Sequence, residues 1–248
     1  VWAAALHAAA PIPQAEREAL LALYDAANGQ SWTNNDGWAE EHGTECSWYG
    51  ITCYLDGDEA TGTYRVGSIN LTGNNLSGTI PAQLGGLDWL GGLALDENQL
   101  TGTIPPELGN LSSLTYLVLS GNQLTGSIPP ELAGLANLSL LGLNGNQLTG
   151  TIPPGLGGMP RLQYLILAHN QLAGAIPPEL GNLPDLLGLN LSNNQLTGGI
   201  PPELGNLLDL QSLILFANPL QGSIPSQLGN LANLELLSIE ENELTGPI

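Results

Sequence analysis

Few side chains in this chain have the types and spacing that catalysis needs. His169 is the only histidine after His42, and no serine or cysteine nucleophile with an orienting acid accompanies it in a recurring geometry. The neighbouring acids Asp96-Glu97 and Glu240-Glu241 lie too far apart in the chain to act together. Its many glycines form no phosphate-binding loop motif. The sequence therefore predicts a protein that is not an enzyme and needs no cofactor.

Metal ligands are also scarce. Cys46 and Cys53 are the only cysteines, and His42 is the nearest histidine. These candidates, irregularly spaced, fall short of the tetrahedral ligand set of a zinc site. The acidic segment 56–59 lacks the rest of a calcium-loop ligand pattern, so we interpret it as a solvated hairpin. We expect no metal site.

A strict repeat of 24 residues sets the position of almost every other residue. Asparagine lies six residues before each repeated isoleucine, from Asn74 to Asn242, and glycine lies two residues before it, from Gly78 to Gly246. No insertion or deletion interrupts this spacing, so the chain is predicted to be an array of like units. The repeated isoleucines are Ile80, Ile104, Ile128, Ile152, Ile176, Ile200, Ile224 and Ile248.

Each unit combines short segments with different patterns. Alternating leucines in 116–120, 164–168 and 212–216 predict strands with one buried side. The Gly-x-Ile-Pro segment is predicted to be extended, because proline cannot donate to a ladder. Leucines three residues apart favour a helical or 3₁₀ turn, and the asparagine amide can satisfy backbone groups of its own and the neighbouring coil. One unit cannot bury its leucines alone, so we expect stacked units with all strands parallel in one sheet.

The pattern L-x-x-L-x-L-x-x-N-x-L, extended by L-x-G-x-I-P, resembles the plant-type leucine-rich repeat over roughly residues 66–248. Residues 46–53, C-x-W-x-G-I-x-C, resemble the N-terminal cap of that family. The resemblance implies an α/β repeat solenoid, a horseshoe or superhelix of about eight coils, with a parallel β-sheet on its concave face and a helical cap. It also implies a disulfide between Cys46 and Cys53, and hence an oxidising, extracellular compartment.

We assign residues 1–65 to an apolar N-terminal segment and the cap, and residues 66–248 to the repeats, without a C-terminal cap. Residues 1–10 have the small-residue pattern of a signal-peptide end, or form an apolar segment that packs on another surface. Residues 13–24 predict a helix with Gly29 as its stop. Three tryptophans follow and should cover the open end of the first coil: Trp32, Trp38 and Trp48.

The charge excludes two classes of partner. The formal net charge is −20, with 23 acidic residues and only three basic ones, Arg17, Arg65 and Arg161. Such a chain is repelled by nucleic acids and anionic membrane surfaces, and no stretch is long enough to insert into a membrane. Four glutamates recur three residues after the isoleucine and should form a solvated stripe on the convex side: Glu107, Glu131, Glu179 and Glu203.

In the implied fold, alternate strand residues line the concave face, and its middle is unusually apolar. Contiguous exposed apolar surface marks contact sites, although valine and isoleucine also suit strands in general. We interpret these residues as partner-binding because aromatic side chains are enriched at interfaces. They are Tyr116, Val118, Leu140, Tyr164, Ile166, Ile214 and Phe216.

Asn-x-Ser/Thr sequons make five asparagines candidate N-glycosylation acceptors, although several of these sequons follow from the repeat itself. Two of them, Asn70 and Asn190, fall on strand positions that face the concave side, where glycans would interrupt a docking surface. The five are Asn70, Asn75, Asn110, Asn137 and Asn190.

We therefore expect a non-enzymatic extracellular protein that contacts a protein or peptide through its concave face. The alternative is a structural subunit of a filament, surface layer or adhesin, in which unlike ends join head to tail. Residues proposed for that contact are Val1, Trp2, Leu6, Leu237, Ile239, Leu244 and Ile248. An ice-binding array would need an unbroken rank of threonine or serine, and the rank that includes Thr79 and Thr103 breaks at Ala175 and Gly199.

Overall fold

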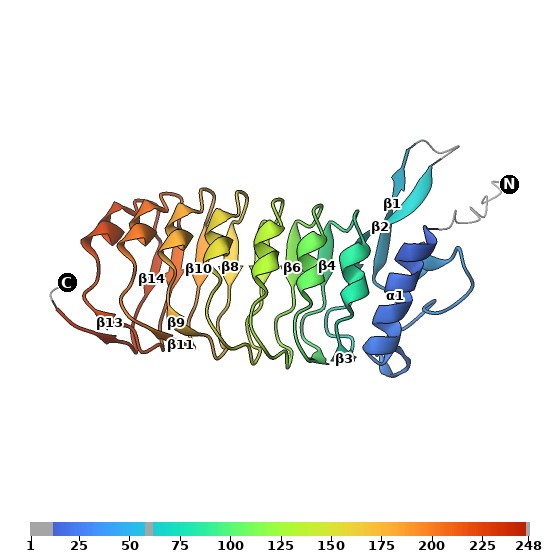
Figure 1. Cartoon of the computed structure of the whole chain (residues 1–248), viewed down its shortest axis with the longest axis horizontal. Helices are drawn as coiled ribbons and strands as arrows, with labels where there is room; N and C mark the ends of the chain where they lie inside the picture. Colours follow the sequence, from blue (N-terminus) through green and yellow to red (C-terminus); the bar gives the residue numbers. More distant parts are fainter. Residues whose placement is uncertain (1–11, 58–61, 247–248) are drawn as a thin grey trace.

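The computed structural model describes residues 12–57 and 62–246. The chain forms a row of stacked coils that begins at a helical cap (Figure 1). One nine-stranded sheet runs along this row in the order β1-β2-β4-β6-β7-β8-β10-β12-β14. Its strands are Ile51–Asp56 (β1), Thr63–Asn70 (β2), Gly92–Ala94 (β4), Tyr116–Val118 (β6), Leu140–Gly142 (β7), Tyr164–Ile166 (β8), Gly188–Asn190 (β10), Ser212–Ile214 (β12) and Leu236–Ser238 (β14).

Each coil contributes one short strand, and its central leucine points into the core. From β2 onward neighbouring strands are parallel and pair at intervals of 24 residues, so that Tyr116, Leu140 and Tyr164 lie side by side. The central residues from Ile69 of β2 to Leu213 of β12 are buried because each coil covers its neighbour, whereas Leu237 of the last strand β14 is 43% exposed. The predicted repeat solenoid with a parallel sheet is thus confirmed.

The first strand of the sheet, β1, belongs to the cap and not to a repeat unit. Strand β1 runs antiparallel to β2, with Ile51 opposite Ile69 and Asp56 opposite Thr63. The short connection between these strands explains the direction, because only antiparallel neighbours can be joined by a hairpin. Part of that connection, residues 58–61, lies outside the described residues.

Seven of the short 3₁₀ helices, η3 to η9, lie in the coils, and η1 and η2 lie in the cap; two-stranded ladders join some of the coils at a second side. Glycines such as Gly102 and Gly126, both with φ of +76°, hold the turn before each isoleucine in a conformation that other residues adopt at a cost. The helices are Gly29–Ser31 (η1), Glu45–Ser47 (η2), Ala82–Gly86 (η3), Pro106–Asn110 (η4), Pro130–Gly134 (η5), Pro154–Gly158 (η6), Pro178–Asn182 (η7), Pro202–Asn206 (η8) and Ser226–Asn230 (η9). The ladder strands are Ser77–Thr79 (β3), Gln99–Thr101 (β5), Ala173–Ala175 (β9), Gln195–Thr197 (β11), Gln221–Gly222 (β13) and Glu243–Leu244 (β15).

The repeated asparagine joins each coil to the one before it. The side-chain amide of Asn146 donates to the carbonyl of Leu119 in the preceding coil and to that of Leu143 in its own coil, at 3.0 and 3.1 Å. Its oxygen accepts the N–H of Leu124 at 3.0 Å. The same pattern recurs at buried Asn98, Asn122, Asn170, Asn194 and Asn218. One side chain thus satisfies backbone groups that the turn would otherwise leave buried and unpaired.

Replacing Asn146 by leucine should therefore destabilise the solenoid. The variant keeps the volume but leaves the buried Leu124 N–H without its partner, at a cost of about 1–3 kcal/mol, while the Leu119 carbonyl keeps only the bond from Asn122. Urea unfolding measures the loss, and Gln147→Leu, at an exposed neighbouring position, should change stability by only about 0.5 kcal/mol. Equal unfolding midpoints for Asn146→Leu and wild type would show that these bonds do not support the fold.

The cap closes the first coil with aromatic side chains. Helix α1 (Gln14–Ala26) packs with a cluster in which the ring centroids of Trp32 and Trp38 lie 4.9 Å apart and those of Trp38 and Trp48 5.0 Å apart. All three tryptophans are buried in the same core as Ile69 of the first coil. They cover that coil as predicted, because its leucines would otherwise meet water.

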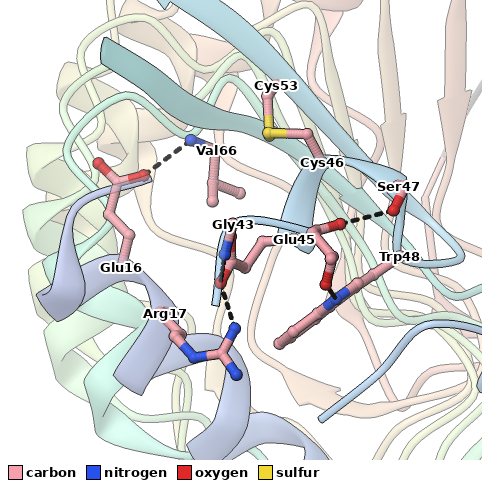
Figure 2. The surroundings of a disulfide bond; sticks show 10 residues. Glu16, Arg17, Gly43, Glu45, Cys46, Ser47, Trp48, Cys53 and Val66 are labelled. Atoms are coloured by element: carbon pink, nitrogen blue, oxygen red, sulfur yellow. Dashed lines mark hydrogen bonds and ion pairs between the residues drawn. A yellow bond between two sulfur atoms is a disulfide. The ribbon is translucent and has the colours of Figure 1, made fainter. Parts of the chain in front are cut away.

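Two buried glutamates tie α1 to the rest of the cap. Glu16 accepts the backbone N–H of Val66 at 2.8 Å and pairs with Arg65 at 3.1 Å. Glu45 forms an ion pair with Arg17 and accepts the Gly43 N–H at 3.0 Å. Figure 2 shows Glu16 with Val66, and Arg17 with Glu45, near the disulfide between Cys46 and Cys53. This disulfide confirms the predicted pairing.

These contacts set the protonation of Glu45. Burial raises its pKa, but hydrogen bonds from its own backbone N–H, from Gly43 and from Arg17 outweigh burial and hold the pKa below its usual range. The guanidinium of Arg17 also lies 5.2 Å from the ring centroid of Trp48. The charged carboxylate of Glu45 therefore stabilises the folded cap.

The contribution of Glu45 to stability should depend on pH. It is complete above the pKa of unfolded glutamate, about 4.3, and is lost as pH falls through the lowered pKa of the folded state. We expect Glu45→Gln to cost about 3 kcal/mol at pH 7, because it leaves Arg17 without its buried partner. Urea unfolding should show that this difference from wild type shrinks at about pH 3. Exposed Glu131→Gln is the control, and a Glu45→Gln difference that stays constant with pH contradicts this assignment.

Candidate functional site

The side of the nine-stranded sheet that faces away from the leucine core is called the concave face here. We define it by four rows of residues. The rows begin at Ser68, Asn70, Thr72 and Gly73, and each continues at intervals of 24 residues. The structure places all seven predicted partner-binding residues on this face, in β6, β7, β8 and β12 and just after β12. Tyr164 is 40% exposed and the other six are half-buried. We call these seven residues the apolar strip: Tyr116, Val118, Leu140, Tyr164, Ile166, Ile214 and Phe216.

Two glycines allow the tyrosines of the strip to lie flat against the sheet. A Cβ atom at Gly92 would fall 2.0 Å from Cζ of Tyr116, so this ring covers the neighbouring strand β4. A Cβ atom at Gly188 would fall 2.9 Å from Cδ1 of Tyr164, so this ring leans toward β10. The two rings therefore diverge from Leu140, which lies between them.

Polar residues of the third row border the apolar strip. The hydroxyl of Thr72 donates to Asp96 at 2.8 Å, and that of Ser120 donates to Asn144 at 2.6 Å. Ser238 donates to Glu240 at 2.7 Å, and this bond holds the pKa of Glu240 below its usual range. The edge of the strip is therefore polar, as is typical of interfaces.

The residues examined for catalysis do not come together. His169 is exposed, with Nε2 3.5 Å from the side-chain amide of Asn193, and this is the one side-chain contact found for it in residues 12–57 and 62–246. Within the same residues, no group of three or more histidine, cysteine or acidic side chains could hold a metal ion. No helix there is long and apolar enough to cross a membrane.

The sequon asparagines differ in their surroundings. Asn70 and Asn190 lie on the concave face. The side-chain oxygen of Asn70 accepts the backbone N–H of Thr72 at 3.3 Å, and that of Asn190 accepts the hydroxyl of Ser192 at 2.7 Å. Asn75 and Asn110 are exposed, and half-buried Asn137 donates to a backbone carbonyl at 2.8 Å. Glycosylation of the five sequons stays a prediction.

The residues proposed for self-assembly are only partly described. Leu237, Ile239 and Leu244 line an open hollow with Ile224 at the outer side of the last coil, and Leu237 is 43% exposed. The remaining four candidates lie outside the described residues: Val1, Trp2, Leu6 and Ile248.

The structure also exposes apolar side chains that the sequence reasoning missed. Trp89 is 43% exposed, in the turn before β4, and Leu208 is 61% exposed on the outer surface. The signal for Trp89 was available, because equivalent positions one to six repeats later are all polar: Ser113, Asn137, Arg161, Asp185, Asp209 and Asn233. An alignment of the repeats is enough to show that Trp89 is a large aromatic residue at a position that is polar in the later repeats.

Comparison with protein families identifies both parts of the chain. A model described as the leucine-rich-repeat N-terminal domain matches residues 13–54. Leucine-rich-repeat models match residues 65–124, 137–159, 160–198 and 209–231. No curated protein matched the chain.

Solved structures show the same architecture. The PEPR1–AtPEP1 crystal structure is 36% identical, with a TM-score of 0.86, over 95% of this chain and 32% of that one. The Arabidopsis receptor kinase HAESA, in complex with the peptide hormone IDA and the co-receptor SERK1, is 35% identical with a TM-score of 0.81, over 95% and 39%. A plant ice-binding protein is 28% identical with a TM-score of 0.71, over 96% and 89%. The chain thus spans about a third of the length of the first two.

Proposed function

This chain belongs to the plant-type leucine-rich-repeat family, and we propose that it is a non-enzymatic extracellular recognition protein that binds a peptide or protein segment on its concave face. The observation that carries the proposal is the apolar strip. Five of its residues come from the neighbouring strands β6, β7 and β8, whereas Ile214 and Phe216 lie beyond Gly188 and Asn190 of β10, and no other described element covers this face. Exposed apolar surface of this extent with a polar border is typical of a contact site.

The structural relatives support a peptide or protein partner. HAESA was solved with a peptide hormone and a co-receptor, and it shares the fold of this chain along nearly all of its described length. This chain corresponds to only part of HAESA, so we infer the nature of its partner from the residues of its own concave face. An extended peptide fits that face, because it can run across several coils and contact each in turn.

The cap supports an extracellular location. Its disulfide needs an oxidising compartment to form and persist. The acidic surface repels nucleic acids and anionic membrane surfaces, which leaves proteins and peptides as the favoured partners. Within the described residues, no nucleophile, base and acid lie together in a cluster that could catalyse a reaction on a bound partner. The proposed role is therefore binding alone.

Replacing Tyr116 and Tyr164 together by alanine should abolish binding without unfolding the chain. Aromatic residues that dominate an interface each contribute about 2 kcal/mol or more, so we expect at least about 30-fold weaker binding to peptides selected on wild type. Fluorescence polarisation measures the affinity. Trp89→Ala removes an equally exposed aromatic residue outside the four rows and should leave binding unchanged. Undiminished affinity of the double variant would exclude the apolar strip as the binding surface.

Self-assembly is a second candidate function, and one observation favours it. Leu236 and Leu237 on β14 are 48% and 43% exposed, and β14 pairs with only one strand in the described residues. A further coil stacks on such an edge, whether it belongs to the same chain or to another copy.

Particle size separates the two candidates. If recognition is the function, light scattering and negative-stain microscopy should show monodisperse particles whose size does not change on dilution. Filaments that shorten on dilution and disappear in a Leu237→Glu variant would instead make self-assembly the function. Glu131→Gln serves as the control for a surface substitution away from the edge.

Ice binding, known from the name of one structural relative, is not proposed for this chain. Thr79, Thr103 and Thr151 form part of an exposed rank before the isoleucines. The rank continues with Ala175 and Gly199, which have no hydroxyl, so it does not present a regular surface.

A further inference from the structure

Charged residues on the concave face are confined to two acidic pairs. Asp96-Glu97 follows β4, and Glu240-Glu241 follows β14. The equivalent positions of the five coils between them carry no charged residue, apart from titratable His169. These positions are Ser120, Gly121, Asn144, Gly145, Ala168, His169, Ser192, Asn193, Phe216 and Ala217. The apolar strip thus lies between two negative ends.

These acids have no basic partner in the described structure. Every ion pair found in residues 12–57 and 62–246 lies in the cap or reaches it, and uses Arg17 or Arg65. Arg161 lies in the turn before β8, outside the four rows. Thr72 donates a hydroxyl hydrogen bond to Asp96, and the hydroxyl of Ser238 donates to Glu240, which holds the pKa of Glu240 below its usual range. The two pairs therefore remain available to positive charge from outside.

The spacing of the pairs sets the size of a ligand that reaches both. Six inter-strand steps separate β4 from β14 in the sheet. At about 4.8 Å a step they span about 29 Å, the length of about nine residues of extended chain. A peptide of this length that crosses the strands would place its centre over Tyr164 of β8, and it would also pass over Tyr116, Leu140 and Ile214.

We propose that the ligand of the concave face is a cationic peptide segment with an apolar centre, whose basic residues at the two ends meet Asp96-Glu97 and Glu240-Glu241. This inference rests on the proposed function and adds the chemistry of the partner. Apolar contact along the strip supplies most of the affinity. The acidic ends raise the association rate, fix the position of the peptide along the solenoid and reject acidic partners.

Three synthetic peptides of about nine residues test the proposal. All have blocked termini and the same centre, in which apolar residues alternate with serine. Their two residues at each end are lysine, glutamine or glutamate. Binding is measured by fluorescence polarisation at low ionic strength to the intact protein. We expect the lysine peptide to bind at least about tenfold more tightly than the glutamine peptide, because several exposed ion pairs each add a few tenths of a kcal/mol. The glutamate peptide should bind most weakly.

Two matched variants separate local from diffuse attraction. The first neutralises the acidic ends, with Asp96→Asn, Glu97→Gln, Glu240→Gln and Glu241→Gln. The second neutralises the same number of charges on the convex side, with Glu107→Gln, Glu131→Gln, Glu179→Gln and Glu203→Gln. The concave variant should lose the preference for lysine over glutamine, and the convex variant should keep it.

The other possible results distinguish failure of the cationic-ligand proposal from failure of the proposed function. Equal binding of the lysine and glutamine peptides, still dependent on Tyr116 and Tyr164, overturns the cationic ligand and leaves the proposed function standing. An equal loss of preference in the convex variant shows diffuse attraction to an acidic protein and also overturns the inference. Failure of every peptide to bind overturns the proposed peptide recognition with it. If the concave variant unfolds, the peptide series still decides, because it uses the wild-type protein.

Discussion

The buried asparagine between successive coils is the contact on which the rest of the structure depends. Its amide group satisfies two carbonyls and one N–H at the point where the chain leaves each strand, as at Asn146. A hydrophobic residue of similar size cannot do this, and a polar residue of another shape cannot reach both coils. The coil length is therefore fixed, and every strand meets its neighbour in the same register.

This constraint divides the chain into two kinds of position. Leucine, isoleucine, asparagine and glycine at invariant places build the core and the turns, and they leave no freedom for function. The outward strand residues carry no such demand, so Tyr116, Leu140 and Tyr164 can differ from coil to coil. Gly92 and Gly188 belong with them, because their missing side chains let the tyrosine rings lie flat. Recognition is thus a property of the positions that the fold leaves open.

The sequence predicted the repeated interior well, because the spacing of Leu117, Asn122 and Gly126 recurs in every unit and each type has one physical use. It predicted a hairpin at segment 56–59 but not that β1 would extend the sheet of the repeats, because that depends on how the cap folds onto the first coil. Nor could it pair Arg17 with Glu45, since residues 28 positions apart in a non-repeating segment have no periodic signal. The residue types predicted which residues form the concave face. The position of each tyrosine ring over a neighbouring glycine could be seen only in the structure.

The central claim is that a bound peptide lies along the apolar strip of the concave face. The most direct measurement places a photo-crosslinking residue at the centre of the lysine-ended peptide and maps the adduct on the intact protein by mass spectrometry. We expect adducts within residues 164–166, at the middle of the span, and within the neighbouring strands 140–142 and 188–190. Adducts confined to the 3₁₀ helices such as Pro130–Gly134, or to the ladder strands such as Gln99–Thr101, would contradict it.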